Sequence, residues 1–365
     1  MMSRNITGTT TVITLDNEEF RSIFTNEVIQ IIEIFRKYGH DLRIAGGAVR
    51  DLLMNVRPRD IDFATTATVH EMRSFFTRAN IHMLNPNGEK HGTITVHINN
   101  KNFEITTLRI DKGLEKLTDI SMWVSDASRR DLTINAMFVD FNGTVYDYFN
   151  GYDDLMRRRV IFVGDASLRI KEDYLRILRY FRFCGSLCRA PFKHQAFTLE
   201  TIQNYAQGLS IVSGERIWSE LKKILSCNYA EELMLEIIKC NIGPYCGLAE
   251  RPNVIEFKRA CATSKGKLTI NPISLITALS NNIMEAINMH ERLKLSLFER
   301  DLSFFIIQER NKVDQIYVGL NDYKEMHLKR HIKREFIEEL LKYSNKESLY
   351  MSFKNWNGKV NEAKK

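Results

Sequence analysis

The chain has 365 residues, of which 44% are hydrophobic and 27% are charged, and it contains only six prolines. This composition is typical of a folded protein and excludes a largely disordered chain, and the length predicts two or more domains. Lysine and arginine number 52 against 45 aspartates and glutamates, an excess that favours a polyanionic partner such as nucleic acid. No apolar run reaches the length of about eighteen residues that a membrane span requires.

The six cysteines form no CxxC pair. We therefore expect reduced thiols rather than a disulfide framework or a zinc site. The first fifteen residues lack the apolar stretch of a secretory signal.

Residues up to about 150 combine helical periodicity with short strands, and later residues are predicted to be helical throughout. A capping box formed by Asp16 and Glu19 begins the first helix. The predicted helices of this first part are Asp16–Tyr38, Val49–Met54 and Val69–Arg78. The predicted strands are Leu42–Ala45, Asp60–Phe63, Thr93–Ile98, Phe103–Leu108, Ile134–Phe141 and Val145–Phe149. Beyond Gly151, amphipathic helices separated by prolines 191, 244, 252 and 272 continue to the end.

A glycine pair lies where a predicted strand meets a predicted helix. The strand runs into Gly46 and Gly47, and the helix follows directly. Glycine lets backbone N–H groups come close to an anion, and a helix N-terminus favours negative charge. Arg50, in the first turn, is placed to reach the same phosphate. On this motif alone, a turn that only connects two elements remains an alternative.

Two aspartates follow on the next predicted strand. Because side chains alternate along a strand, Asp60 and Asp62 are expected on one face, about 7 Å apart. A divalent cation would relieve their repulsion, and Mg²⁺ prefers carboxylate oxygens while keeping positions for substrate phosphates. Glu104, on a later strand, is a candidate third carboxylate. The alternatives are a solvent-facing acidic pair and an edge-strand charge. Together, the glycine turn and the acidic pair predict a site for nucleoside triphosphate chemistry.

Two arginine-rich segments carry further candidates. In the first, the adjacent Arg129 and Arg130 suit bidentate contacts to phosphate or ribose. Asp131 and Asn135 are placed to orient these arginines by hydrogen bonding. The alternative for this segment is a surface cluster of ion pairs.

The second arginine-rich segment is predicted to be helical. Asp173 and Arg176 stand one turn apart and are therefore neighbours, whereas Arg179 and Arg182 drift around the helix. A carboxylate only accepts hydrogen bonds and a guanidinium only donates them. Such a pair matches a base edge with an amino group beside a bare ring nitrogen, which cytosine and adenine offer and uracil and guanine do not. The pair is thus a candidate for selecting C and A without a nucleic-acid template. A helix with salt bridges is the alternative.

Taken together, these segments resemble the motifs of class II tRNA nucleotidyltransferases, the CCA-adding enzymes, and are most similar to those of eukaryotic members. In the family's order, the motifs bind metal, recognise ribose, form a hinge, act as the amino-acid template and support that template. The corresponding segments here are Gly46–Asp51 with Asp60–Asp62, Arg129–Asn135, Tyr148–Leu155, Glu172–Arg176 with Arg179 and Arg182, and Ser213–Leu221. The resemblance covers roughly residues 40–225, and no motif is evident beyond about 230.

The resemblance implies an α+β chain in four domains. A mixed-sheet nucleotidyltransferase head of polymerase-β-like fold would span 1–150, and a helical neck with the base template 151–225. A helical body and a helical, tRNA-binding tail would span 226–290 and 291–365. The implied reaction is the template-independent addition of C, C and A to the 3′ end of tRNA from CTP and ATP, with two Mg²⁺ ions and release of pyrophosphate.

Roles for individual residues also follow from the resemblance. Asp60 and Asp62 are implied as the catalytic metal ligands, with Glu104 as a possible third. The implied nucleotide-binding residues are Gly46, Gly47, Arg50, Arg130, Asp173, Arg176, Arg179 and Arg182. Arg179 and Arg182 would brace the template or touch phosphates. Ile110–Asp126 falls where the family has a flexible loop linked to the change from CTP to ATP.

The resemblance also bears on location and assembly. It implies an intracellular enzyme acting in mitochondria, or in the cytoplasm and nucleus, or in both. A monomer is slightly favoured, and no membrane partner is expected.

Two other functions remain open from the sequence. A bacterial-type poly(A) polymerase shares the head motifs, although its longer basic C-terminal tail is absent here. A catalytically idle RNA-binding protein on the same scaffold is the second, but binding alone does not need the acidic pair Asp60 and Asp62 facing a polyanion.

Overall fold

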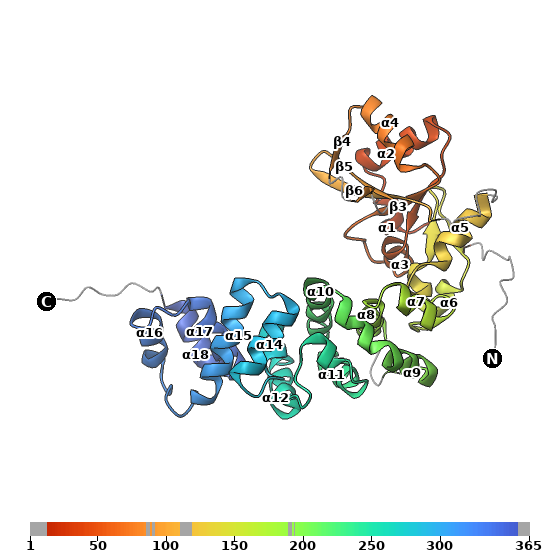
Figure 1. Cartoon of the computed structure of the whole chain (residues 1–365). Helices are drawn as coiled ribbons and strands as arrows, with labels where there is room; N and C mark the ends of the chain where they lie inside the picture. The colour runs from red at the N-terminus through yellow and green to blue at the C-terminus, as the bar shows by residue number, and fades with distance from the viewer. Residues whose placement is uncertain are drawn as a thin grey trace. The chain divides into compact units, whose positions relative to one another are not determined.

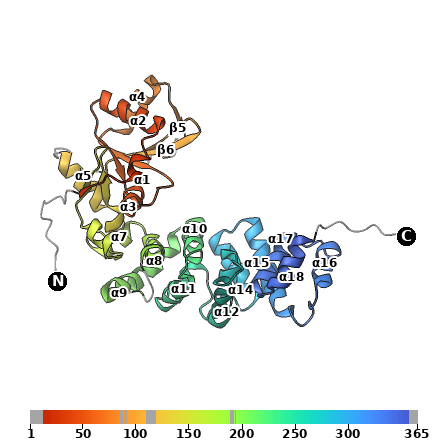
Figure 2. The ribbon, with the colours of Figure 1, turned by 180° about the vertical axis from the view of Figure 1, so that it is seen from behind.

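The computed structural model describes residues 13–84, 88–89, 92–109, 119–188, 192 and 194–356. The chain divides into two compact units, Met1–Arg169 and Ile170–Lys365. We call the first the sheet unit, because it holds all strands named below, and the second the helical unit (Figures 1 and 2).

Within the described residues, eight strands of the sheet unit form one mixed sheet in the order β1-β8-β7-β2-β3-β6-β5-β4. Neighbouring strands are antiparallel except for β3 and β6, which run parallel. The strands are β1 (Ile13–Thr14), β2 (Leu42–Ala45), β3 (Asp62–Thr65), β4 (His82–Leu84), β5 (Thr93–Ile98), β6 (Lys101–Thr107), β7 (Met137–Val139) and β8 (Thr144–Asp147).

Helices accompany both faces of this sheet. They are α1 (Glu18–Arg21), α2 (Asn26–Lys37), α3 (Gly47–Leu53), α4 (Val69–Arg78), α5 (Asp119–Ser128), the 3₁₀ turn η2 (Thr133–Asn135) and α6 (Gly151–Met156). Phe35 of α2 forms an aromatic cluster with Phe75 and Phe76 of α4. On the opposite side, Trp123 of α5 joins a buried cluster with Ala64 of β3.

The alternation of side chains along β3 places the predicted metal ligand on the side of α5. Asp62 and Ala64 are two residues apart and therefore point to the same face. Helix α5 is fixed there by Arg43 of β2, whose guanidinium lies 4.0 Å from the ring centroid of Trp123 and 3.7 Å from that of Tyr146. Such cation–π stacking holds α5 at the border of the face that carries Asp62.

The helical unit begins within α7 (Ala166–Glu172), which crosses from Arg169 to Ile170. Helix α10 packs against α8, α11, α13 and α14, and α8 and α10 lie side by side in both views (Figures 1 and 2). The remaining α-helices are α8 (Arg176–Leu187), α9 (Ala196–Tyr205), α10 (Gly214–Leu225), α11 (Ala230–Lys239), α12 (Val254–Ser264), α13 (Pro272–Thr277), α14 (Ile283–Leu293), α15 (Leu297–Glu309), α16 (Leu320–Leu328), α17 (Arg334–Tyr343) and α18 (Glu347–Asn355). The 3₁₀ turns are η3 (Ala206–Ile211), η4 (Gly243–Cys246) and η5 (Arg310–Lys312).

The predicted α+β class is confirmed, while several boundaries differ. The helix expected at Asp16–Tyr38 is two helices, α1 and α2. Asn17, rather than Asp16, caps the first, because its side chain accepts the N–H of Phe20 at 2.8 Å. Pro272 begins α13, and Pro191 lies outside the described residues. In the part of the chain that the structure describes, no helix is long and apolar enough to cross a membrane.

Candidate active site

Asp62 and Glu104 form a carboxylate pair on the sheet. Asp62 is the first residue of β3 and is paired in register with Glu104 of β6. Partners in a parallel ladder point to the same face, on strands about 4.8 Å apart. Asp60 lies in a bend before β3. The prediction that Asp60 and Asp62 share a strand face is therefore wrong, because the strand begins two residues later than expected.

The carboxylates of Glu104 and Asp60 nevertheless both repel the carboxylate of Asp62. The pKa of Asp62 lies above its ordinary value, because burial disfavours its charge and because Glu104 and Asp60 repel it, while Arg130 acts in the opposite direction. Asp62 keeps an exposed edge, so water still reaches the carboxyl group. We therefore give the crowding of negative charge more weight than burial.

A divalent cation fits this arrangement, since it would relieve the repulsion that raises the pKa of Asp62. The carboxylates of Asp62 and Glu104 would hold the cation, with the charge of Asp60 nearby. Among the residues that the structure describes, no three His, Cys, Asp or Glu side chains are grouped closely enough to hold a metal ion by themselves.

The glycine turn lies beside Arg130. Gly46 precedes α3 with φ 67° and ψ −120°, a conformation that side chains other than hydrogen disfavour. Its N–H donates to the carbonyl of Met137 at 3.1 Å. A Cβ atom at this position would lie 2.9 Å from a terminal guanidinium nitrogen of Arg130. Gly47 is the first residue of α3. The turn thus brings its backbone close to the guanidinium of Arg130.

Arg50 and Asn135 connect the glycine turn to the first arginine-rich segment. Arg50 donates to Oδ1 of Asn135 at 2.7 Å, and the amide of Asn135 donates to Asp131 at 3.2 Å. Arg50 also donates to Asp51 at 2.7 and 3.0 Å. These bonds hold the Arg50 guanidinium in one orientation. The sequence predicted that Asn135 and Asp131 orient Arg129 and Arg130; in the structure the Asn135 side chain orients Arg50, and Arg130 donates to the backbone carbonyl of Asn135 at 3.3 Å.

Arg130 is held by a carboxylate that sequence reasoning missed. Asp126, which is 4% exposed, accepts hydrogen bonds from Arg130 at 3.0 Å and from the backbone N–H of Arg109 at 3.2 Å. The guanidinium carbon of Arg130 also lies 4.7 Å from the ring centroid of Phe138. Asp126 was noted only as the last residue of the predicted loop segment Ile110–Asp126, and the only sequence signal for this contact is its position four residues before Arg130, near the end of α5.

The base-template candidates belong to the helical unit and lie at a break between helices. Helix α7 ends at Glu172 and α8 begins at Arg176, so the prediction of one continuous helix here is wrong. The reason is local: Oδ1 of Asp173 accepts the N–H of Leu175 at 3.1 Å, a side-chain bond that competes with helix continuation. Asp173 and Arg176 remain close, since the N–H of Arg176 donates to the carbonyl of Asp173 at 3.0 Å.

Each member of this pair has an ionic partner. Oδ2 of Asp173 accepts from Arg216 of α10 at 2.7 Å, and Arg176 donates to Glu172 at 2.7 Å. The sequence placed Glu172 in the motif but gave it no role, and it placed Arg216 in the supporting motif without singling it out.

Arg182 joins two helices. It donates to Glu220 of α10 at 2.5 Å, and its guanidinium carbon lies 4.0 Å from the ring centroid of Phe183. Glu220 is buried and also accepts from Lys223 at 3.2 Å. The corresponding distance from Arg179 to the ring of Phe183 is 5.6 Å. The geometry of Arg182 suits a brace between α8 and α10.

The segment predicted as a nucleotide-switching loop, Ile110–Asp126, is described only in its second half. Residues 110–118 lie outside the described residues, and Asp119–Ser128 form α5.

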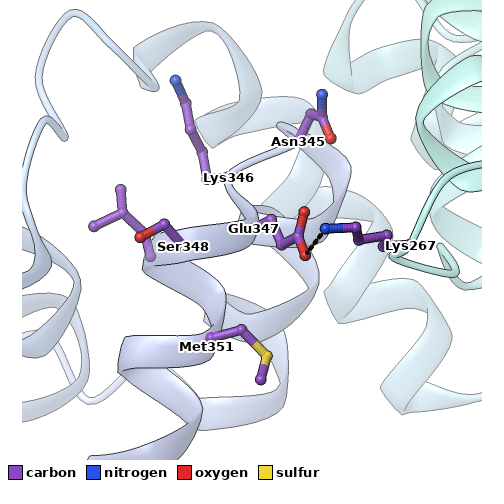
Figure 3. A pocket seen from close by; sticks show the side chains of 7 residues that line it. Lys267, Asn345, Lys346, Glu347, Ser348 and Met351 are labelled. Carbon is purple, nitrogen blue, oxygen red and sulfur yellow. Dashed lines mark ion pairs between the residues drawn. The ribbon is translucent and has the colours of Figure 1, made fainter.

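Two surface pockets lie away from these groups in sequence. One, in the helical unit, is lined by Lys267, Asn345, Lys346, Glu347, Ser348, Leu349 and Met351 (Figure 3). There, Lys267 pairs with Glu347 at 3.0 Å, so its charge is compensated. The other lies in the sheet unit near Arg73 and Glu89, which pair at 3.1 Å. Neither pocket contains a predicted site residue.

Comparison with known proteins agrees with this geometry. The family described as "Poly A polymerase head domain" matches residues 42–161, and the one described as "Probable RNA and SrmB- binding site of polymerase A" matches residues 192–245. A solved structure, "Crystal structure of Bacillus stearothermophilus CCA-adding enzyme in complex with CTP", has the same fold with a TM-score of 0.72 at 23% identity, covering 93% of this chain and 82% of that one.

Curated relatives are more similar in sequence. "CCA tRNA nucleotidyltransferase 1, mitochondrial" of Homo sapiens is 44% identical over 357 residues, which cover 94% of this chain and 81% of the relative. The protein of the same name from Danio rerio is 48% identical over 303 residues, covering 81% of this chain and 69% of the relative. By this similarity, and with the acidic pair, glycine turn and arginine segments in the expected order, the chain belongs to the family of CCA tRNA nucleotidyltransferases.

Proposed function

We propose that this enzyme adds C, C and A in that order to the 3′ end of tRNA, with CTP and ATP as nucleotide donors. The observation that carries the proposal is the ladder pair of Asp62 and Glu104 on the sheet face, with Arg130 acting on Asp62 and lying against Gly46. In each step the tRNA 3′ hydroxyl attacks the α-phosphate, and the bond to the β-phosphate oxygen breaks to release pyrophosphate.

We assign the metal-binding role to Asp60 and Asp62, with Glu104 as the third carboxylate. When bound there, Mg²⁺ ions would activate the 3′ hydroxyl and stabilise the leaving oxygen of pyrophosphate. The protein itself contributes the convergence of negative charge at Asp62, which supports cation binding.

Gly46, Gly47, Arg50 and Arg130 are proposed to bind the nucleotide's triphosphate and sugar. Planar guanidinium groups suit bidentate contacts to phosphate and hydroxyl oxygens. Arg50 and Arg130 are each oriented by protein contacts before any nucleotide is present, so little ordering cost remains when the nucleotide binds.

Asp173 and Arg176 are proposed to select the base. The acceptor oxygens of Asp173 suit the amino group of cytosine or adenine, and the guanidinium of Arg176 suits the adjacent ring nitrogen. Arg182, which braces α8 against α10 through Glu220, acts on the template indirectly. For Arg179 we propose the same bracing role or a phosphate contact.

Further parts of the proposal concern domains, partners and location. We propose that the head spans residues 1–150 of the sheet unit and that the neck spans 151–225, beginning in the last part of the sheet unit and continuing in the helical unit. A body at 226–290 and a tRNA-binding tail at 291–365 complete the proposed division. The mitochondrial names of the relatives support action in mitochondria. Action in cytoplasm and nucleus, and a monomeric state, are tested by cell fractionation and light scattering.

One experiment tests the reaction. A tRNA lacking its last three nucleotides is incubated with the purified protein, Mg²⁺ and each nucleoside triphosphate, alone and in combination. We expect two additions with CTP alone and a third when ATP is also present. A long A tail would instead identify a poly(A) polymerase, and no extension would identify an RNA-binding protein without this activity.

A further inference from the structure

The guanidinium of Arg43, on β2, is packed against aromatic rings from two other elements. Its carbon lies 4.0 Å from the ring centroid of Trp123 on α5 and 3.7 Å from that of Tyr146 on β8. Arg43 also donates to the hydroxyl of Tyr148 at 3.4 Å and pairs with the exposed Asp41 at 3.5 Å. Only 12% of its side chain is exposed, which leaves little surface for contact with a substrate.

The contacts continue from Trp123 to a proposed nucleotide-binding arginine. The ring centroids of Trp123 and Phe138 lie 4.8 Å apart in an edge-to-face arrangement. The guanidinium carbon of Arg130 in turn lies 4.7 Å from the ring centroid of Phe138. Because a close-packed interior transmits small displacements, a shift of the Trp123 ring reaches Arg130 through Phe138.

Helix α5 provides a second connection to Arg130. Asp126 follows Trp123 by three residues, so both side chains lie on the same side of the helix. The carboxylate of Asp126 accepts a hydrogen bond from Arg130 at 3.0 Å. Two groups that hold the Arg130 guanidinium, the ring of Phe138 and the carboxylate of Asp126, therefore both depend on where Trp123 lies.

Folding stability alone does not require an arginine at position 43. Burying a charge costs desolvation, and a well-packed apolar side chain of similar volume is often equally stable. A methionine would fill the space beside Trp123 and Tyr146, but it is flexible and has no fixed plane. A guanidinium is planar, stacks on aromatic rings and donates hydrogen bonds in fixed directions. Arg43 therefore fixes the orientation of the Trp123 ring relative to the sheet.

We propose that Arg43 is a positioning residue for nucleotide binding: by stacking on Trp123 it holds α5 where Phe138 and Asp126 orient Arg130, and it touches neither the nucleotide nor the tRNA. This inference rests on the proposed role of Arg130 in binding the triphosphate and sugar. Arg43 itself lies outside the motifs named above, the first of which begins at Gly46.

The test measures KM and kcat for CTP on a tRNA that lacks its last three nucleotides, and for ATP on a tRNA that lacks only the terminal A. The variants are Arg43→Met, Arg43→Lys, Arg130→Ala and the double variant Arg43→Met with Arg130→Ala. Arg259→Met is the matched control, because Arg259 also stacks on an aromatic ring, that of Tyr343 at 4.8 Å, but lies on α12 of the helical unit. A melting curve for each variant reports folding.

We expect Arg43→Met to raise KM for CTP and for ATP by the same factor, about fivefold, since a shift well below 1 Å should cost less than the roughly hundredfold loss that 1 Å can cause. The kcat should change little, because Arg130 is proposed to bind the nucleotide rather than the transition state alone. Arg43→Lys should raise KM less, since it keeps a cation near the rings but loses the planar fork.

The double variant and the control complete the expectation. The double variant should have the KM of Arg130→Ala alone, because the guanidinium that Arg43 positions is gone. Arg43→Met should melt within about 3 °C of the wild type. Arg259→Met should keep the wild-type KM for both nucleotides, whatever its melting temperature.

Several results would overturn the inference. If Arg43→Met and Arg43→Lys keep the wild-type KM while Arg130→Ala raises it, Arg43 does not position Arg130. If the effects of Arg43→Met and Arg130→Ala multiply, or if KM rises for ATP alone, Arg43 acts by another route. If Arg43→Met does not fold, Arg43→Lys decides by the same criteria. If Arg130→Ala itself keeps the wild-type KM, the proposed role of Arg130 fails and the inference fails with it; that result is distinct, because this variant leaves Arg43 unchanged.

Discussion

The contact between the glycine turn and Arg130 allows a test in which stability and catalysis respond differently. Gly46 has φ 67°, and a Cβ atom there would lie 2.9 Å from a terminal nitrogen of Arg130. Ordinary van der Waals contact for a Cβ begins near 3.4 Å. In Gly46→Ala, Arg130 must therefore retreat by about 0.5 Å, and it can do so cheaply because the clashing atom is the end of a flexible side chain.

The substitution has two separate effects, one on folding stability and one on kcat/KM. With φ 67° and ψ −120°, Gly46 lies outside the left-handed helical region, so an L-residue there costs on the order of 1–3 kcal/mol of stability. The displacement of Arg130 has little effect on folding, but it moves a proposed nucleotide contact. Since a misplacement of about 1 Å can cost on the order of a hundredfold in rate, we expect kcat/KM for both CTP and ATP to fall by about tenfold.

Gly39→Ala is the matched control. Gly39 also has positive φ, at 74°, but its added Cβ would meet no atom within 4 Å. Both variants should lose stability in urea unfolding, Gly46→Ala the more because its ψ of −120° lies outside the left-handed helical region. Only Gly46→Ala should lose kcat/KM in single-nucleotide incorporation assays. If both variants keep wild-type kcat/KM, the idea that Gly46 positions Arg130 for the nucleotide is refuted.

Four further predictions concern other parts of the molecule. Asp60→Ala or Asp62→Ala should abolish CMP and AMP incorporation while tRNA binding in a filter assay persists; near-normal incorporation would remove that residue from the metal site. Shortening the segment Ile110–Asp126, whose second half belongs to α5, should spare both CMP additions and impair AMP addition on sequencing gels, whereas equal loss of both would indicate a structural role. Arg176→Ala should admit UTP or GTP, because the guanidinium donors to cytosine and adenine are lost; unchanged selectivity in a folded variant would exclude the template role. The nearby hydroxyl of Thr25 and the backbone N–H of Glu27 itself, together with hydrogen bonds from Asn99 and Lys101, lower the pKa of Glu27 to about 2. The ionised Glu27 should therefore stabilise the fold fully above its ordinary pKa of 4.5, and this contribution should be lost as the pH falls toward 2. In urea unfolding, the difference in unfolding free energy between wild type and Glu27→Gln should shrink between about pH 6 and about pH 3. A constant difference would contradict this.

The strands were predictable where local pattern decides them. Leu42–Ala45 and Thr93–Ile98 match the predicted boundaries, because alternating apolar residues on a half-buried pleat produce a strong signal. The prediction missed β4, the three-residue strand at His82–Leu84 that owes its conformation to pairing with β5. Such an element depends on a distant partner, which a local window does not contain.

The site residues show the same division between local and distant causes. The resemblance could identify Asp62 and Arg130 as site residues from their places in the family's motifs. It could not show that β3 starts at Asp62, because that boundary depends on the pairing with β2 and β6. The break between α7 and α8 was also missed, although its cause is local. Helical periodicity continues through Asp173, and the competing bond from Asp173 to Leu175 leaves no trace in that periodicity.

Four of the five arginines of the proposed site share a further feature that only the structure shows. Arg50, Arg130, Arg176 and Arg182 are each bonded to a carboxylate, respectively of Asp51, Asp126, Glu172 and Glu220. A guanidinium is a planar fork, so one fixed carboxylate contact restricts its orientation as well as its position. The motifs therefore supply the positively charged guanidinium groups that bind a nucleotide, while the acidic partners fix the orientation of those groups. Two of these partners, Asp126 and Glu220, are buried, and neither is itself a predicted substrate contact. Replacing such a partner should leave the arginine charged but free its guanidinium to change orientation. We therefore expect nucleotide recognition to weaken more than the affinity for tRNA as a polyanion.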